Sequence, residues 1–396
     1  MTENITTSND KFRDGEHLIA AFSGNPAGPT LIVVGGLHGN ESAGALALIE
    51  MAEKVETIQD SLKGRVYFLA GNTRALARGV RFVDSDLNRH WTAGNMSGVS
   101  ATLSEDIELA EIVQQMDGIL ITAMDEVFVL DLHSTSADGL HFATVGDTLR
   151  NRAFAQKFPV TILLGIEEQL EGTMLEYLNN AGAVTLGFEG GQHESDKTIE
   201  NHKAMVWLAM LNAGIIDAPA VPALNQYRDQ LTTGEHDSHI FEIRIRHAVS
   251  ADDSFKMQPG FNNFDPIHRG DVLGNGKSGP VTSSESGVIM MPLYQTLGED
   301  GFFIGREISP FWLWLSGLLR RLRIQKMIHI LPGVSRVPGD PSTLDVNTAV
   351  ARLFPLQVFH LLGFRRRRWD GNKLTVSRRK HDTSGPFKWK GEVNGR

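Results

Sequence analysis

Two patterns of apolar and polar positions alternate along the first 215 residues. Short apolar runs of strand length are separated by longer stretches in which apolar residues recur at helical spacing. The alternation is typical of an α/β fold, here a three-layer αβα sandwich with a mixed, mostly parallel sheet. The predicted strands are residues 17–22, 31–34, 65–72, 126–135, 139–146, 160–165 and 183–191, and the clearest predicted helices are 42–54 and 103–115.

Three of the predicted strands end in side chains that commonly bind metals or transfer protons. One strand runs into His38 and Glu41, a second contains His133, and a third ends at Glu189. Ligands of open α/β sheets bind at the carboxyl ends of the strands, so these side chains are expected to converge. A His-x-x-Glu pair alone carries little weight, because its spacing is common, and the interpretation depends on this convergence.

These residue types favour a metal site with a neighbouring base. His133 is the expected third ligand, and Asp131 is expected to orient it or to be a structural carboxylate. Glu189 follows an apolar strand and precedes Gly190-Gly191, where partial burial raises a carboxyl pKa toward the range of a general base. The alternatives are a capped strand end at His133 and an ion-paired strand end at Glu189.

A long segment, residues 73–98, is expected to be an irregular loop near the sheet. It contains RFVDSDLNRH, in which Arg81, Asn88 and Arg89 could clamp a carboxylate, since arginine binds carboxylates bidentately. Long loops in compact domains usually carry function. A solvated basic loop is the alternative.

Composition narrows the possible chemistry. The chain has 396 residues, 41% hydrophobic and 21% charged, which is typical of globular proteins. There is no cysteine, so disulfides and thiolate ligands are excluded, and any metal must be held by His, Asp or Glu. The first residues are polar and lack the apolar region of a secretory signal, so a cytoplasmic location is expected.

The composition and the predicted elements change from about residue 217. A Pro/Ala-rich hinge follows the predicted catalytic domain at residues 15–216 and precedes turn-bounded strands, which predict a small β domain over residues 236–308. His247 and His268 in this region are expected to be surface or core histidines rather than metal ligands.

Residues 309–396 form a basic C-terminal extension. The net charge is +12 for residues 317–396 and −21 for residues 1–316. The apolar run at 308–319 is shorter than the roughly twenty residues of a transmembrane helix; a buried helix, an interfacial helix and an oligomer contact remain open. The basic stretch at 364–380 could bind an anionic membrane surface, with no strong case for nucleic acid, or could dock on the acidic body. Residues 385–396 are expected to be disordered.

The motifs GGLHGNE, DLNRH, DLHST and FEGG, in this order, resemble the succinylglutamate desuccinylase/aspartoacylase family, which is related to the zinc carboxypeptidases. The resemblance covers about residues 15–310. It implies one Zn²⁺ per chain on His38, Glu41 and His133, with water in the fourth position. It also implies that Glu189 is the general base and then the proton donor to the leaving amine.

The same resemblance implies substrate contacts from the long loop. Arg81 would polarise the scissile carbonyl, and Asn88 and Arg89 would bind a substrate carboxylate. In aspartoacylases an arginine ten residues before the catalytic glutamate reads the substrate side chain, and an ungapped alignment puts Asn179 there. A family tyrosine is replaced near Phe302 and Phe303. These departures predict a less polar or larger acyl or amine group.

The sequence therefore predicts a zinc-dependent hydrolase that cleaves the amide bond of a small N-acyl compound such as an N-acyl amino acid. The alternatives are a carboxypeptidase- or esterase-type zinc hydrolase and a noncatalytic peripheral binding protein that uses the basic tail. A homo-oligomer is possible. The acyl group, the amine and the identity of the metal are left open by the sequence.

Overall fold

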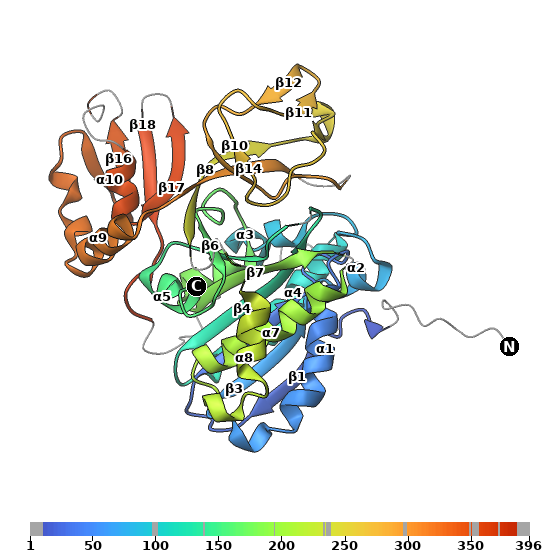
Figure 1. The fold of residues 1–396 in the computed structure, drawn as a ribbon. Helices are drawn as coiled ribbons and strands as arrows, with labels where there is room; N and C mark the ends of the chain where they lie inside the picture. The colour runs from blue at the N-terminus through green and yellow to red at the C-terminus, as the bar shows by residue number, and fades with distance from the viewer. Residues whose placement is uncertain are drawn as a thin grey trace.

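The computed structural model describes residues 11–96, 102–137, 139–193, 195–232, 234, 239–295, 299–347, 350, 356–370 and 373–385. In this part of the chain, eleven strands form one mixed sheet in the order β1-β3-β2-β4-β7-β5-β6-β8-β14-β13-β10. The predicted α/β sandwich with a mostly parallel core is confirmed (Figure 1). The strands are β1 (Leu18–Ser23), β2 (Thr30–Gly35), β3 (Arg65–Ala70), β4 (Val127–Thr135), β5 (Phe142–Val145), β6 (Thr161–Leu164), β7 (Val184–Gln192), β8 (Ile240–Ala248), β10 (Pro266–Ile267), β13 (Gly287–Met290) and β14 (Asp300–Glu307).

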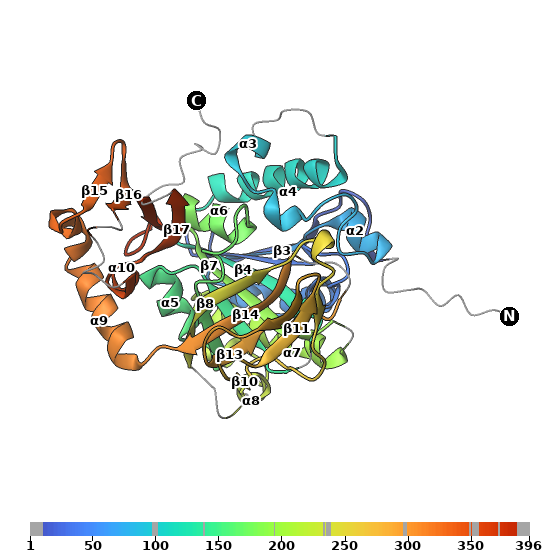
Figure 2. The same cartoon turned by 90° about the horizontal axis from the view of Figure 1, so that it is seen from above.

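The two faces of the sheet are covered by different helices. Figure 2 shows α4 on one side and α7 and α8 on the other. On β2, Leu31 and Val33 join the core under α1 and α7, whereas Ile32 and Val34 join the core under α4 and α6, because successive strand residues point to opposite faces. The helices are α1 (Ala43–Glu56), α4 (Ser104–Ile121), α5 (Leu149–Ala155), α6 (Met174–Ala181), α7 (Asp196–Asn212) and α8 (Leu224–Leu231).

The segment expected to be an irregular loop contains regular structure. Helix α2 (Thr73–Arg78) begins after Asn72, whose side chain accepts a hydrogen bond from the Ala75 N–H, and ends at Gly79 in the left-handed conformation, φ 63°. A short turn of 3-10 helix, η3 (Leu87–Arg89), and α3 (Ala93–Met96) follow. The helix was not predicted because a two-turn helix is too short to show a clear apolar period.

The predicted β region is joined to the main sheet. Strand β8 pairs in parallel with β6, and β14 and β13 continue the sheet from β8. A three-stranded sheet, β12-β11-β9, packs beside them, with β9 (Lys256–Met257), β11 (Val272–Gly276) and β12 (Gly279–Thr282). The proposed boundary near residue 217 lies between α7 and β8, and the division into domains stays a prediction.

The C-terminal module, residues 310–385, has a core of its own. A four-stranded antiparallel sheet, β15-β16-β18-β17, packs with α9 and α10 around side chains such as Leu344, Phe359 and Val376. The elements are α9 (Pro310–Arg321), β15 (Val334–Val337), β16 (Asp340–Asn347), α10 (Leu356–Leu361), β17 (Phe364–Asp370) and β18 (Lys373–Arg378). The sequence did not predict this sheet. Residues 386–396, expected to be disordered, lie outside the described residues.

No helix in the described ranges is both long and apolar enough to span a membrane.

Candidate active site

The turn after β2 places His38 and Glu41 at the carboxyl edge of the sheet. The chain reverses at Gly36, φ 78°, a backbone conformation that glycine adopts without strain. A Cβ on Gly39 would come within 2.1 Å of the Ala75 carbonyl carbon, so the turn packs directly on α2. The Glu41 N–H then donates to the His38 carbonyl oxygen at 3.0 Å, which fixes the spacing between the two side chains.

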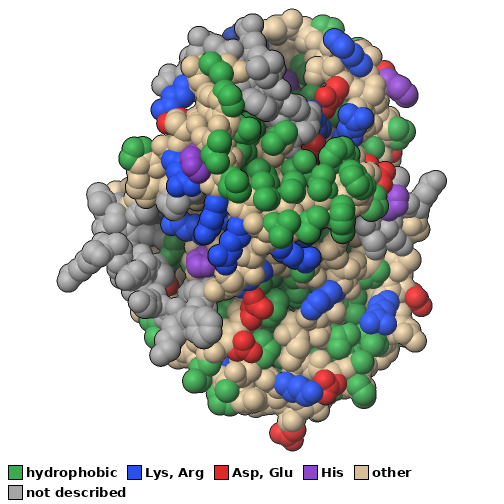
Figure 3. All heavy atoms as spheres, turned by 90° about the vertical axis from the view of Figure 1, so that its left-hand side faces the viewer, with side chains coloured by type: hydrophobic (Ala, Val, Ile, Leu, Met, Phe, Trp, Pro, Cys, Tyr) green, Lys and Arg blue, Asp and Glu red, His purple; other side chains and the backbone are tan. Residues whose placement is uncertain are grey.

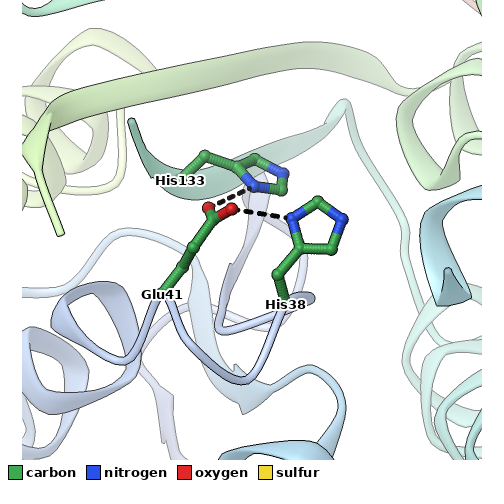
Figure 4. Close-up of side chains that lie close together, drawn as sticks. All are labelled: His38, Glu41 and His133. Carbon is green, nitrogen blue, oxygen red and sulfur yellow. Dashed lines mark hydrogen bonds and ion pairs between the residues drawn. The ribbon is translucent and has the colours of Figure 1, made fainter. Parts of the chain in front are cut away.

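His38, Glu41 and His133 point toward one another from two elements (Figure 4). The Glu41 carboxylate lies between the two rings, with Oε1 2.9 Å from His38 Nδ1 and Oε2 3.1 Å from His133 Nδ1. The three ligand atoms all lie within 4.8 Å of one another. The structure therefore brings together the three residues that the sequence singled out as metal ligands.

Electrostatics favours the charged forms of Glu41 and His133 despite their burial. Burial alone would raise the pKa of Glu41, but the neighbouring His38 and His133 hold it well below its usual value. Burial likewise opposes protonation of His133, yet Asp131 and Glu41 raise its pKa well above the usual value.

Two outer carboxylates bind the other nitrogen of each ring. Asp131 Oδ2 lies 2.8 Å from His133 Nε2, and Asp86 Oδ1 lies 3.1 Å from His38 Nε2. Arg81 Nη2 also lies 3.1 Å from His38 Nε2. With Nε2 of each ring held by these partners, Nδ1 of each ring faces Glu41. The sequence predicted that Asp131 could orient a ligand histidine, but the same role was not predicted for Asp86. The signal that could have indicated it is the position of Asp86 at the start of the DLNRH motif.

Glu189 lies beside the cluster on β7, where it is the register partner of His133 across the β4–β7 pair. Its side chain is buried, and Oε2 has no hydrogen-bond partner within the described part of the chain. Burial raises the pKa of Glu189 to about 7; the nearby His133 opposes the rise and Glu41 adds to it. A carboxyl group with this pKa can gain and lose a proton near neutrality.

Arg81 reaches the cluster from the other side. It donates from Nη1 to Glu41 Oε1 and from Nη2 to Asp86 Oδ2, both at 3.2 Å. Its side chain is mostly buried, so a positive charge lies at the rim of the His38 and Glu41 pair. The segment expected to be a loop thus brings Arg81, the arginine that the family resemblance assigns to the scissile carbonyl, beside the cluster.

Asn88 and Arg89 line the same cleft but have different surroundings. The Met174 N–H donates to Asn88 Oδ1 at 2.9 Å, which ties η3 to the start of α6. Arg89 lies 3.6 Å from Glu299 and 3.5 Å from Asp300, distances that belong to loose ion pairs. Both residues are therefore near the cluster, with the arginine in partial contact with carboxylates of the chain itself.

The cleft above the cluster has a largely apolar wall. This wall comes from the segment after β6, from α6, from the segment after β13 and from β14, and it faces the polar floor formed by the metal candidates and Glu189. The apolar residues of the wall are Ile166, Leu170, Leu175, Met291, Leu293 and Phe303.

The position aligned with the substrate-reading arginine does not face this cleft. Asn179 is fully buried in α6 and donates to the Ala183 carbonyl oxygen at 2.9 Å. The replacement of arginine by Asn179 in the ungapped alignment therefore gives no information on the substrate, because Asn179 closes the turn between α6 and β7. Phe303 does line the cleft, whereas Phe302 stacks on His247 with ring centroids 4.8 Å apart.

A second group of possible ligands, His17, Glu108 and Glu111, lies at a different place. Arg74 Nη1 lies 2.8 Å from carboxylate oxygens of both Glu108 and Glu111. The guanidinium already neutralises the two carboxylates, so this group is a buried ion-pair network rather than a cation site.

Comparisons with known proteins agree with the family resemblance that the four sequence motifs indicate. Residues 27–212 match the family model described as the succinylglutamate desuccinylase/aspartoacylase catalytic domain. A probable aspartoacylase from Nostoc sp. (strain PCC 7120) is 32% identical over 106 residues, 27% of this chain and 35% of that protein. An N-acyl-aromatic-L-amino acid amidohydrolase (carboxylate-forming) from Xenopus laevis is 30% identical over 152 residues, 35% of this chain and 48% of that protein.

The chain thus matches between about a third and a half of the length of these curated relatives. Among solved structures, a succinylglutamate desuccinylase/aspartoacylase from Rhodobacter sphaeroides superposes with a TM-score of 0.55 at 17% identity, covering 73% of this chain and 88% of that one. This superposition shows a shared fold.

Proposed function

Because residues 27–212 belong to the succinylglutamate desuccinylase/aspartoacylase catalytic-domain family, we propose that this protein is a zinc-dependent hydrolase of small N-acyl compounds. The observation that carries the proposal is the convergence of two imidazoles and a carboxylate beside Glu189, a buried carboxyl whose Oε2 lacks a protein partner. A structural role alone would not require a carboxyl of raised pKa next to three candidate ligands.

The donor set fits zinc. Two imidazole nitrogens and one carboxylate, with a fourth position for water or substrate, are the ligands of known hydrolytic zinc sites. The Nδ1 atoms of His38 and His133 both face Glu41, and the carboxylates on Nε2 hold the rings in that orientation. Zinc bound there supplies a Lewis acid and lowers the pKa of water toward about 7.

Glu189 transfers the proton in the proposed reaction. Its Oε2 accepts a proton from the attacking water as the water oxygen adds to the amide carbonyl carbon. The same carboxyl then gives that proton to the amide nitrogen as the carbon–nitrogen bond breaks, which yields a carboxylic acid and an amine. A pKa of about 7 for Glu189 makes both directions accessible near neutral pH.

The arginines bind charge in this proposal. Arg81 lies at the rim of the cluster, where its guanidinium stabilises negative charge that develops on the carbonyl oxygen. Arg89 exchanges its loose contacts with Glu299 and Asp300 for the carboxylate of an N-acyl amino acid. The amide NH₂ of Asn88 donates to the same carboxylate while Oδ1 stays on Met174.

The apolar wall favours a substrate with an apolar or aromatic group. Leu170, Met291 and Phe303 would contact that group. The relative from Xenopus laevis is named for N-acyl-aromatic amino acids, which supports the same class. A cytoplasmic location and a homo-oligomeric state stay predictions.

The test combines metal analysis with a substrate panel. The panel holds N-acetyl forms of aromatic, aliphatic and acidic amino acids, with a dipeptide and a carboxylate ester, and each is assayed on wild type, Glu189→Gln and the control Glu53→Gln on the exposed face of α1. We expect one zinc per chain, preference for apolar N-acyl amino acids, loss of about 10²–10⁴-fold in kcat in Glu189→Gln with metal retained, and an unchanged control. Absence of metal affinity, or turnover confined to the peptide or the ester, would contradict the proposal.

A further inference from the structure

The C-terminal module carries a cluster of exposed apolar side chains on one face. The apolar patch consists of Phe311, Trp312, Trp314, Leu322, Met327 and Ile330, which belong to α9 and the turns that follow it. Trp314 is 62% exposed and Ile330 68% exposed. Figure 3, which looks at the side of the molecule that carries α9, shows a band of hydrophobic side chains with Lys and Arg side chains along one margin.

Helix α9 places polar side chains at its most buried positions and aromatic side chains at exposed ones. Its buried residues are Ser316 and Arg320, and its exposed residues include two tryptophans and a phenylalanine. The Ser316 hydroxyl donates to the Leu361 carbonyl oxygen at 2.7 Å, and Arg320 donates to Asp147 Oδ2 at 2.9 Å. These polar contacts and the partly buried Leu313 and Leu319 hold the helix in place, and the two tryptophans and the phenylalanine face outward, where water disfavours them.

A basic margin accompanies the apolar patch. Arg321, Arg323 and Lys326 are exposed, and no carboxylate in the described residues forms an ion pair with them. Residues 317–396 carry a net charge of +12, in contrast to −21 for residues 1–316. Part of this positive charge is neutralised within the protein, as where Arg320 pairs with Asp147 and Arg379 with Glu167, whereas the three cations at the margin of the patch are exposed.

We propose that this patch docks the protein on an anionic lipid bilayer. Tryptophan and phenylalanine insert at the boundary between headgroups and acyl chains, and neighbouring arginines and lysines bind anionic headgroups. Helix α9 has 12 residues, enough to lie in the interface and too few to cross the bilayer. The acidic body is repelled from the same surface, which selects the module as the face that touches it.

The charge pattern disfavours the other obvious occupant, a second copy of the chain. A symmetric dimer places the same patch of both subunits in contact. Arg321, Arg323 and Lys326 would then lie near their own copies, with no carboxylate beside them to compensate. An anionic membrane supplies the missing negative charge.

The test uses the full-length protein and sedimentation with vesicles of phosphatidylcholine, alone or mixed with phosphatidylserine. The first variant, Trp312→Ser with Trp314→Ser, removes the two tryptophan side chains of the patch. The matched control, Ile121→Ser with Met124→Ser, removes two apolar side chains that are 65% and 74% exposed on the catalytic body. The second variant, Arg321→Gln with Arg323→Gln, removes two charges and leaves the apolar residues.

Wild type and the control are expected to bind the mixed vesicles, and bound protein to decrease as salt rises. The charge variant should bind about fivefold more weakly for each charge removed, and the tryptophan variant should lose most binding while keeping the wild-type circular dichroism spectrum. Equal binding of the tryptophan variant and the control, or no preference for phosphatidylserine, would overturn the proposal. So would absence of vesicle binding together with self-association that the tryptophan variant abolishes, which would assign the patch to a second copy. None of these outcomes depends on hydrolytic activity.

Discussion

Replacing Arg320 by methionine is predicted to weaken the attachment of the C-terminal module to the catalytic body. The guanidinium is fully buried and lies 2.9 Å from Asp147 Oδ2 and 3.4 Å from Asp382 Oδ1. It also donates to the carbonyl oxygens of His360 and Leu361, both at 3.2 Å. The substitution would leave two buried carboxylates without their shared cation.

The expected loss in free energy of unfolding follows from which partners remain. Removing one partner of a buried ion pair costs about 3–5 kcal/mol, because the remaining charge stays buried. Asp147 keeps Arg152 at 2.7 Å, and the Leu361 carbonyl oxygen keeps Ser316. These remaining contacts place the expected loss at the lower end, about 3 kcal/mol, a large share of a total stability of about 5–15 kcal/mol.

Urea unfolding of Arg320→Met and of Arg321→Met measures this effect directly. Arg321 is the next residue, is exposed, and is expected to change stability by less than about 0.5 kcal/mol when replaced. Circular dichroism and tryptophan fluorescence should both be followed, since a chain with two cores need not unfold in one step. Equal transitions for the two variants would refute the account of Arg320 as the residue that fastens the module.

Three further predictions concern the site and its surroundings. Asp131→Asn should lower metal affinity about 10–100-fold in a chelator competition, because the His133 ring loses its charged acceptor; an unchanged affinity would show that Asp131 does not orient the ligand. Gly190→Ala should lower the urea midpoint by the equivalent of about 1–3 kcal/mol, since the new Cβ would lie 2.6 Å from a carbon of the buried His202 ring; a wild-type midpoint would mean that the ring moves freely. Burial raises the pKa of Glu167 to about 7, above the value near 4.3 of an unfolded glutamate, so its stabilising contribution is full below about pH 4 and is lost as pH rises through 7. Between pH 5 and 8 the stability of wild type should therefore fall relative to Glu167→Gln, and a difference that rises with pH would contradict this sign.

Much of the central fold can be predicted from local patterns of apolar and polar residues. The apolar runs of β2, β4 and β7 and the residues at their ends are visible in the sequence, because a buried parallel strand needs a continuous apolar run and then a polar exit. The turn between His38 and Glu41 is equally local, since glycines and three residues of spacing fix it.

Other features depend on contacts between distant segments. The role of Asp86 as a partner of His38 could not be predicted from the sequence, because the contact joins residues that are 48 positions apart. An ungapped alignment put Asn179 at the position of a substrate-reading arginine, but the Asn179 side chain is buried and closes the turn between α6 and β7. The sheet of the C-terminal module escaped prediction because its alternation is short: among the described residues, β16 buries only Leu344 and Val346, and β18 only Leu374 and Val376.

The sequence by itself determined which side chains the site has available and on which strand ends they lie. The tertiary structure decided that β4 lies between β2 and β7, which brings His133 beside Glu41 on one side and Glu189 on the other. It also decided that α9 turns its tryptophans outward, because Ser316 and Arg320 find their polar partners inside. Local periodicity encodes the elements, whereas strand order and helix facing are set by the burial and pairing that residues far apart in the chain achieve together.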